Sequence, residues 1–330
     1  MIDASDVSDG RTRELLRRLE LDVTVRLDGL LHGDHRGLVP GHGTELGETR
    51  RYAPGDDVRR IDWNVTARLS EPYIRQTIAD RELETWILAD RSPRLDFGTA
   101  NVEKRDLVLA GTAAVGFLTN RDGNRIGAVL AGQRQSDLIE HKGRPPRGQH
   151  ISDDRNGGHT VIPAKGTRRH LLHILHSLAS SPRHDSGGVT DLAGALHRVN
   201  GIAKRRGLLA VVSDFRVGAG WEDALAIAAV RHDVLAIEVS DPREAELPNV
   251  GLLTVVDPGT GQLRELATNK ASVRQAYADA AAAHHEHLAA TFRKHRIEHL
   301  RLSTDRAWLD DVVSFMANRR LRMNAPGARR

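Results

Sequence analysis

The sequence contains no cysteine among its 330 residues. This absence excludes disulfides, cysteine-ligated zinc sites and thiol nucleophiles, so a hard metal ion would have to be held by oxygen ligands. A chain of this length buries about three quarters of the surface that its unfolded form exposes. We therefore expect a globular protein that folds without a disulfide or a structural metal.

Long apolar runs are also missing. The longest, such as residues 208–212 and 280–283, fall far short of the ~20 residues that a membrane-spanning helix requires. The amphipathic stretch near the N-terminus has acids interspersed and lacks the apolar core of a signal peptide. The sequence therefore predicts a cytoplasmic protein with no membrane span.

Lysine is scarce. Only six of the 48 cationic side chains are lysine, which leaves 42 arginines beside 44 acids and a net charge of +4. Arginine suits bidentate pairing with carboxylate or phosphate. Because the cations alternate with acids along the chain, ion pairs within the protein are the first interpretation of this composition.

Aromatic residues are few as well, at 4% of the chain. The arginine bias favours nucleic-acid binding, but so few aromatic side chains leave little on which bases could stack. The cations also form no continuous basic stripe. Nucleic-acid binding is therefore an alternative hypothesis for function and not the leading one.

The chain divides into two regions of different texture. Residues 1–80 predict a small, partly β N-terminal subdomain, with a helix at about 10–20 and a strand at 21–27. Residues 81–318 predict the main α/β domain, interrupted by a polar loop at about 142–158. Residues 319–330 are expected to form a basic tail.

Short apolar runs alternate with helical stretches in the main domain. Near-continuous apolar strands indicate that both faces of the sheet are covered, as in a parallel sheet, and the alternation predicts a doubly wound fold. The strands are expected at 85–89, 126–130, 208–212, 234–239, 252–256 and 297–302. The helices are expected at about 103–120, 167–179, 191–205, 221–231, 270–295 and 305–320.

Polar residues follow the strands at the edge where such sheets bind ligands. Asp90 and Ser92 follow the first strand, Asp214 follows the strand at 208–212, and Thr190 precedes a helix. Carboxylate and hydroxyl oxygens suit Mg²⁺, which also tolerates water ligands. The sequence therefore predicts a site at the carboxyl edge, with Mg²⁺ as the candidate ion.

This pattern resembles the metal-ion-dependent adhesion site of von Willebrand A-type domains, Asp-x-Ser-x-Ser with a later Thr and a later Asp. An upstream motif resembles the signature of one bacterial branch, the domain-of-unknown-function family fifty-eight. Its residues here are Tyr52, Pro54, Gly55, Asp56, Asp57, Arg59, Asp62 and Trp63. The resemblance implies a von Willebrand A-like, Rossmann-type fold. It also implies a MoxR-type AAA+ ATPase as partner, with this chain as a non-enzymatic adaptor in chaperone-like remodelling or metal insertion.

One position departs from the adhesion-site pattern. Asp90 and Ser92 match its first two positions, but Arg94 stands where the second serine is expected. The Arg94 guanidinium could pair with the carboxylates of Asp90 and Asp214 and replace an ion. Alternatively Arg94 points outward, and Mg²⁺ binds with water in place of one ligand. The sequence leaves both open, so the cofactor is either Mg²⁺ or none.

The upstream motif also has two interpretations. Pro54-Gly55 favours a turn, and Asp56 or Asp57 is suited to cap the helix that follows. Arg59, Asp62 and Trp63 would then lock the N-terminal subdomain against the sheet. The alternative is that the motif forms a surface on which the partner docks.

A metal-dependent hydrolase is the third hypothesis, and catalysis is not expected. A phosphoaspartate enzyme would need an acid two residues after Asp90, and that position is Ser92. No histidine or glutamate follows the ends of these strands to serve as a base. The oligomeric state does not follow from the sequence.

Overall fold

The computed structural model describes residues 14–23, 49–52, 61–69, 71–75, 84–120, 124–132, 158–183, 190–257 and 261–324. Of the upstream motif, Pro54, Gly55, Asp56, Asp57 and Arg59 lie outside these residues. So does the polar loop expected at about 142–158, except for its last residue. In the part of the chain that the structure describes, no helix combines the length and apolarity needed to cross a membrane.

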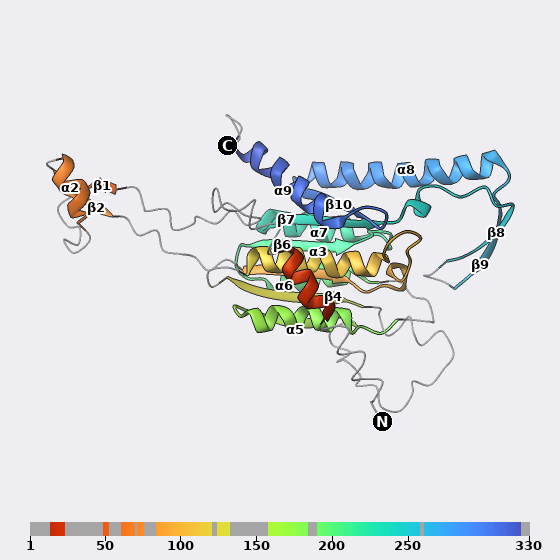
Figure 1. Cartoon of the computed structure of the whole chain (residues 1–330), viewed down its shortest axis with the longest axis horizontal. Coiled ribbons are helices and arrows are strands. Elements are labelled where there is room, and N and C mark those ends of the chain that lie inside the picture. The colour runs from red at the N-terminus through yellow and green to blue at the C-terminus, as the bar shows by residue number, and fades with distance from the viewer. Residues whose placement is uncertain are drawn as a thin grey trace, which may run out of the picture.

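A six-stranded sheet forms the centre of the molecule (Figure 1). In spatial order its strands are β10 (Glu298–Ser303), β7 (Asp233–Ser240), β6 (Leu208–Ser213), β3 (Glu84–Asp90), β4 (Arg125–Ala131) and β5 (Thr160–Lys165). Every neighbouring pair is parallel except β4 and β5. The mostly parallel sheet predicted from the apolar runs is therefore confirmed.

Helices cover both faces of this sheet. The helix at 14–23, α3 (Lys104–Thr119), α5 (Arg168–Ala179) and α9 (Trp308–Asn324) pack against one face in a single apolar cluster. The other face of the sheet is covered by α6 (Leu192–Ile202), α7 (Trp221–Arg231) and α8 (Ala271–Lys294). Along each strand, the residues that contact these helices alternate with the residues that face the first group of helices. Because helices cover both faces of a mostly parallel sheet, the fold is doubly wound.

Two strands differ from the prediction. The edge strand β5 was not expected, because it contains Pro163 and lacks the continuous apolar run of a buried parallel strand. The strand at 252–256 was expected in the main sheet, but β8 (Leu252–Val256) instead pairs with β9 (Leu263–Ala267) in a separate hairpin. Every second residue of β8 is exposed, which a strand covered on both faces would not allow. Figure 1 shows this hairpin beside the start of α8.

The strand predicted at 21–27 is wrong for residues 21–23, which belong to the helix at 14–23. Leu16, Leu19 and Val23 are its buried residues, and their spacing is that of one helix face. The period-two pattern at 21–27 was too short to exclude this alternative. These three side chains join the cluster of the main domain, so the predicted boundary at residue 80 does not hold for this helix.

In the sequence, a small unit lies between the helix at 14–23 and the first strand of the main sheet. β1 (Thr49–Arg51) pairs antiparallel with β2 (Tyr73–Arg75), and α2 (Trp63–Leu69) connects them. Asp62 precedes α2 and accepts a hydrogen bond from the backbone of Val65 at 3.4 Å, as an N-cap does. The partly β character predicted for this region is present.

The C-terminal tail begins later than predicted. α9 continues to Asn324, and the Arg319 side chain is buried and donates a hydrogen bond to Glu298 on β10 at 2.8 Å. Arg319 therefore belongs to the packed domain and not to a solvated tail. Residues 325–330 lie outside the described part of the chain.

Candidate functional site

The carboxyl ends of β3 and β6 place two acids side by side at one edge of the sheet. Asp90 is the last residue of β3, and Asp214 directly follows β6. Because these strands are parallel neighbours in register, their ends meet. Both side chains are almost completely buried.

Asp90 is held by hydroxyl and amide groups. Its Oδ1 accepts hydrogen bonds from the Ser92 backbone N–H at 2.8 Å and from the Thr190 hydroxyl at 2.9 Å. Its Oδ2 accepts from the Ser213 hydroxyl at 2.7 Å. The structure thus brings three of the predicted ligands, Asp90, Ser92 and Thr190, into direct contact.

The charge of Asp90 is poorly compensated. Burial raises the pKa of this carboxyl, and the neighbouring charge of Asp214 raises it further. The three hydrogen bonds act in the opposite direction but do not restore the ordinary pKa. A neutral donor stabilises a carboxylate less than a cation does.

Asp214 is held by a cation, Lys104. The Lys104 Nζ lies 2.8 Å from Asp214 Oδ2 and 2.6 Å from Glu244 Oε1. Lys104 is the first residue of α3 and is 0% exposed, and Glu244 belongs to the 3-10 turn η4 (Pro242–Glu244) after β7. Asp214 Oδ1 accepts from the Arg216 backbone N–H at 3.0 Å. Both carboxylate oxygens of Asp214 therefore have donors.

The pKa values in this group follow from the ion pairs. Burial would raise the pKa of Asp214, but the charge and hydrogen bond of Lys104 outweigh it and lower that pKa. Burial would lower the pKa of Lys104, but Asp214 and Glu244 outweigh it and raise that pKa. A cation at a helix N-terminus also opposes the helix dipole. Lys104 therefore depends on its two acids to remain charged in the core.

A strained residue follows Asp214. Phe215 has a backbone φ of 53°, in the left-handed region that a bulky side chain rarely adopts. Its ring packs against Trp221 and Phe292, with both centroid distances at 5.2 Å, and its N–H donates to Ser213 Oγ. These contacts hold the turn in which Ser213 reaches Asp90 while Asp214 reaches Lys104.

Arg94 does not occupy the place considered for it in the sequence. The cation in contact with Asp214 is Lys104. Arg94 lies on the 3-10 turn η2 (Pro93–Leu95) and lowers the pKa of Asp214 through its charge alone, less than Lys104 does. A side-chain cation is therefore present at this edge, but it comes from α3.

The predicted ligands do not fit a divalent ion well. The carboxylate oxygens of Asp90 and Asp214 all accept hydrogen bonds from protein groups, and a dication here would lie near the Lys104 ammonium. Within the described ranges, no three His, Asp or Glu side chains gather in a way that could hold a metal. Mg²⁺ at this edge remains a prediction from the sequence.

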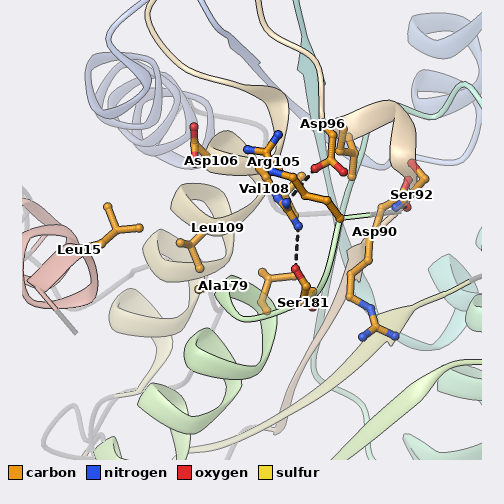
Figure 2. Close-up of a pocket in the computed structure, with 14 residues that line it drawn as sticks. Leu15, Asp90, Ser92, Asp96, Arg105, Asp106, Val108, Leu109, Ala179 and Ser181 are labelled. Atoms are coloured by element: carbon orange, nitrogen blue, oxygen red, sulfur yellow. Dashed lines mark hydrogen bonds and ion pairs between the residues drawn. The ribbon is translucent and has the colours of Figure 1, made fainter. Parts of the chain in front are cut away.

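A cavity of about 320 Å³ opens beside Ser92 (Figure 2). The Ser92 side chain is 3% exposed, and its Oγ has no hydrogen-bond partner among the described residues. Figure 2 shows Arg105 in the wall, where it contacts Asp96 at 2.9 Å and the Ser181 carbonyl at 3.0 Å. Arg183 also lines this space, together with apolar side chains of α3 and α5.

One protein family matches most of this chain. The family described as "Protein of unknown function DUF58" matches residues 48–151 and 147–287, which together exceed half of the chain. The chain belongs to the DUF58 family. The resemblance to this family, stated from the upstream motif, is thereby confirmed.

Mycobacterial relatives match almost the whole DUF58 chain. Uncharacterized protein Rv1480 of Mycobacterium tuberculosis (strain H37Rv) is 45% identical over 315 residues, which cover 96% of this chain and 92% of that protein. Uncharacterized protein Mb1516 of Mycobacterium bovis matches with the same identity and coverage. These names carry no activity or partner.

Two solved structures show a distant likeness. Conserved hypothetical protein BatB from Bacteroides thetaiotaomicron is 12% identical, with 71% of this chain and 98% of that chain covered and a TM-score of 0.38. An aerotolerance-related membrane protein from Bacteroides fragilis is also 12% identical, with 72% and 99% covered and a TM-score of 0.41. TM-scores this low carry no argument about the function of the DUF58 chain.

The upstream motif of this DUF58 chain is described only in part. Tyr52 donates its backbone N–H to the Pro72 carbonyl at 2.8 Å, and Asp62 caps α2. The Trp63 side chain is 70% exposed. Asp62 thus caps α2, a role predicted for Asp56 or Asp57, while Trp63 presents an aromatic surface to solvent.

Sequence reasoning missed two members of the site, Lys104 and Glu244. A lysine that opens a helix and a glutamate after a Pro-Arg pair both look like exposed residues, because their contacts are distant in sequence. Asp241, which follows β7, accepts hydrogen bonds from the Thr99 backbone N–H and the Thr304 hydroxyl, and these contacts are also distant in sequence. The one available signal was that Lys104 is among only six lysines.

Proposed function

We propose that this chain is a non-enzymatic, cytoplasmic adaptor that binds a partner protein at the carboxyl edge of its sheet. The domain would be of the von Willebrand A type, and the edge a degenerate metal-ion-dependent adhesion site. The partner would be a MoxR-type AAA+ ATPase, as the family resemblance suggests. The adaptor would serve chaperone-like remodelling or metal insertion.

One observation carries the choice of this edge. Ser92 lines a cavity, and its Oγ is buried and lacks a partner among the described residues. A hydroxyl kept in this state loses free energy unless a group from outside accepts its hydrogen bond. A carboxylate entering the cavity would satisfy it.

Guanidinium donors in the cavity wall support a carboxylate as the incoming group, although Asp90, Asp96 and Asp106 line the cavity as well. Arg105 and Arg183 line the cavity, and each already holds one acid, Asp96 and Glu103 respectively, at 2.9 and 2.7 Å. A guanidinium has five N–H donors, so each arginine keeps donors for a second acceptor. An aspartate or glutamate side chain of a partner would therefore meet both charge and hydrogen-bond donors here.

The arrangement favours binding over catalysis. The two acids of the edge are fixed by hydrogen bonds and an ion pair, and no base stands within reach of Ser92 among the contacts of the described site. Asp90 accepts hydrogen bonds from the Thr190 and Ser213 hydroxyls, whereas from Ser92 it accepts one only from the backbone N–H and not from the hydroxyl. The Ser92 hydroxyl is therefore not activated as a nucleophile.

Capture of the ATPase tests the proposal. The purified chain is immobilised, and binding of a purified MoxR-type ATPase is measured for the unmodified protein and for Ser92→Ala. Loss of one hydrogen bond to a charged acceptor should weaken binding about tenfold. The matched control is Ser314→Ala, at an exposed position of α9, which should bind as the unmodified protein does.

Two results would contradict the proposal. One is equal capture by the unmodified protein and Ser92→Ala, which would remove this edge as the docking point. The other is no capture of the ATPase by any form, which would remove the partner.

A further inference from the structure

The carboxyl edge already contains a cation. The Lys104 ammonium contacts Asp214 at 2.8 Å and Glu244 at 2.6 Å, and it is fully buried. Glu244 in turn lies 3.8 Å from the Arg216 guanidinium. A charge that is buried to this degree is retained only when its partners compensate it.

The ion pairs of Lys104 connect three separate parts of the fold. Lys104 opens α3, Asp214 follows β6, and Glu244 follows β7. The second oxygen of Glu244 accepts from the Asp241 backbone N–H at 3.1 Å. Lys104 thus joins the ends of two neighbouring strands to the start of a helix, which is what a bound metal ion does in a loop-built site.

We infer that Lys104 is the resident cation of this edge and stands in for the divalent ion that the adhesion-site pattern implies. Asp214 would then be a structural partner of Lys104 and not a metal ligand. The inference concerns the edge named in the proposed function, so binding of the partner there would not depend on a metal. Its test needs no partner.

Removing the ammonium should change what the edge binds. Without Lys104, Asp214 loses the cation that contacts it, and Glu244 keeps only the Arg216 guanidinium at 3.8 Å, with Asp90 nearby. Oxygen ligands of this kind suit Mg²⁺ or Mn²⁺. Lys104→Met would therefore convert a site that ignores divalent ions into one that responds to them.

The first measurement uses the unmodified protein. Its Tm is recorded in EDTA and in about 10 mM Mg²⁺, and Mn²⁺ binding is followed by electron paramagnetic resonance. We expect the same Tm in both solutions and no bound Mn²⁺. One Mn²⁺ bound per chain, or a Tm raised by Mg²⁺, would overturn the inference.

The second measurement compares Lys104→Met with Lys204→Met, whose lysine is exposed on the surface. In EDTA, Lys104→Met should lower the Tm by roughly 10 °C, because the buried Asp214 and the partly buried Glu244 lose their cation. Mg²⁺ or Mn²⁺ should restore part of that loss, while Lys204→Met should behave as the unmodified protein does. A Lys104→Met protein with an unchanged Tm and no metal response would overturn the inference.

If the Lys104→Met protein does not purify as a folded chain, its refolding is measured instead. Refolding in EDTA is then compared with refolding in Mg²⁺, and folding rescued only by Mg²⁺ supports the inference. The Mn²⁺ titration of the unmodified protein decides independently of any variant. Loss of partner binding alone, with the metal results as expected, would count against the proposed function and not against Lys104 as the cation.

Discussion

The two halves of the carboxyl edge compensate their acids in different ways. Asp90 and Asp214 end neighbouring parallel strands and are buried to the same degree. Asp90 is surrounded by the hydroxyls of Thr190 and Ser213 and a backbone N–H, while Asp214 contacts the Lys104 ammonium. The pKa of Asp90 is raised by burial, and the pKa of Asp214 is lowered by Lys104 against the effect of burial.

The difference shows that strand-end position alone does not determine the chemistry of an acid. Both acids occupy the place where doubly wound sheets bind ligands. Only Asp214 lies within reach of the start of α3 and of the turn after β7, which provide Lys104 and Glu244. The Asp214 half is therefore a closed ion-pair network, and the Asp90 half, with the Ser92 hydroxyl beside it, is the part left open to a ligand.

The largest effect is expected from breaking the closed half. Asp214→Asn removes one of the two acids that hold Lys104, so it should lower the free energy of unfolding by about 3 kcal/mol at neutral pH. The pKa of Asp214 is lowered in the folded state, so its contribution is present above the ordinary value of 3.8 and is lost as pH falls below it. Urea denaturation at pH 7 measures the difference.

Asp233→Asn is the matched control for that variant. Asp233 begins β7 and pairs with Arg206 at 3.5 Å on the surface, where the Asp233 side chain is 40% exposed. Exposed ion pairs contribute little, so this change should lower the free energy of unfolding by less than about 1 kcal/mol. Equal losses in the two variants would mean that the Asp214 pair has no special role.

A smaller effect, of opposite sign, is expected in the Asp90 half. Because the pKa of Asp90 is raised in the folded state, its ionisation costs free energy as pH rises above 3.8 through the folded pKa. Asp90→Asn removes that cost and should raise the free energy of unfolding by about 1 kcal/mol at pH 7. The gain should shrink as the pH is lowered from 7 to 4, because the raised pKa means that Asp90 takes up a proton in the folded state before it does in the unfolded chain.

Thermal unfolding of Asp90→Asn and the unmodified protein at both pH values tests the sign. A Tm difference that favours Asp90→Asn at pH 7 and narrows at pH 4 would agree with an uncompensated carboxylate. A variant that is less stable at pH 7 would show that Asp90 is compensated by a charge that the present contacts do not include.

The sequence was most informative where one local rule decides the outcome. The buried strands at the centre of the sheet followed from apolar runs, and Asp90, Ser92 and Asp214 followed from the rule that parallel strands present their ends at one edge. β5 and the placement of β8 did not follow, since both are partly exposed and Pro163 interrupts the first. Lys104 did not follow either, because its burial depends on acids 110 and 140 residues away in the chain.

The smallest stability effect is expected for Ser92→Ala. Its hydroxyl is buried without a hydrogen-bond partner among the described residues, so the fold loses no hydrogen bond when it is removed. The free energy of unfolding should stay within about 0.5 kcal/mol of the unmodified value or rise slightly, since a buried unpaired polar group is itself unfavourable. Urea denaturation measures this on the same samples that are used for ATPase capture. Weaker capture with unchanged stability would assign the Ser92 hydroxyl to the ligand, whereas a loss of several kcal/mol would show that Ser92 supports the Asp90 half of the edge as Lys104 supports the other.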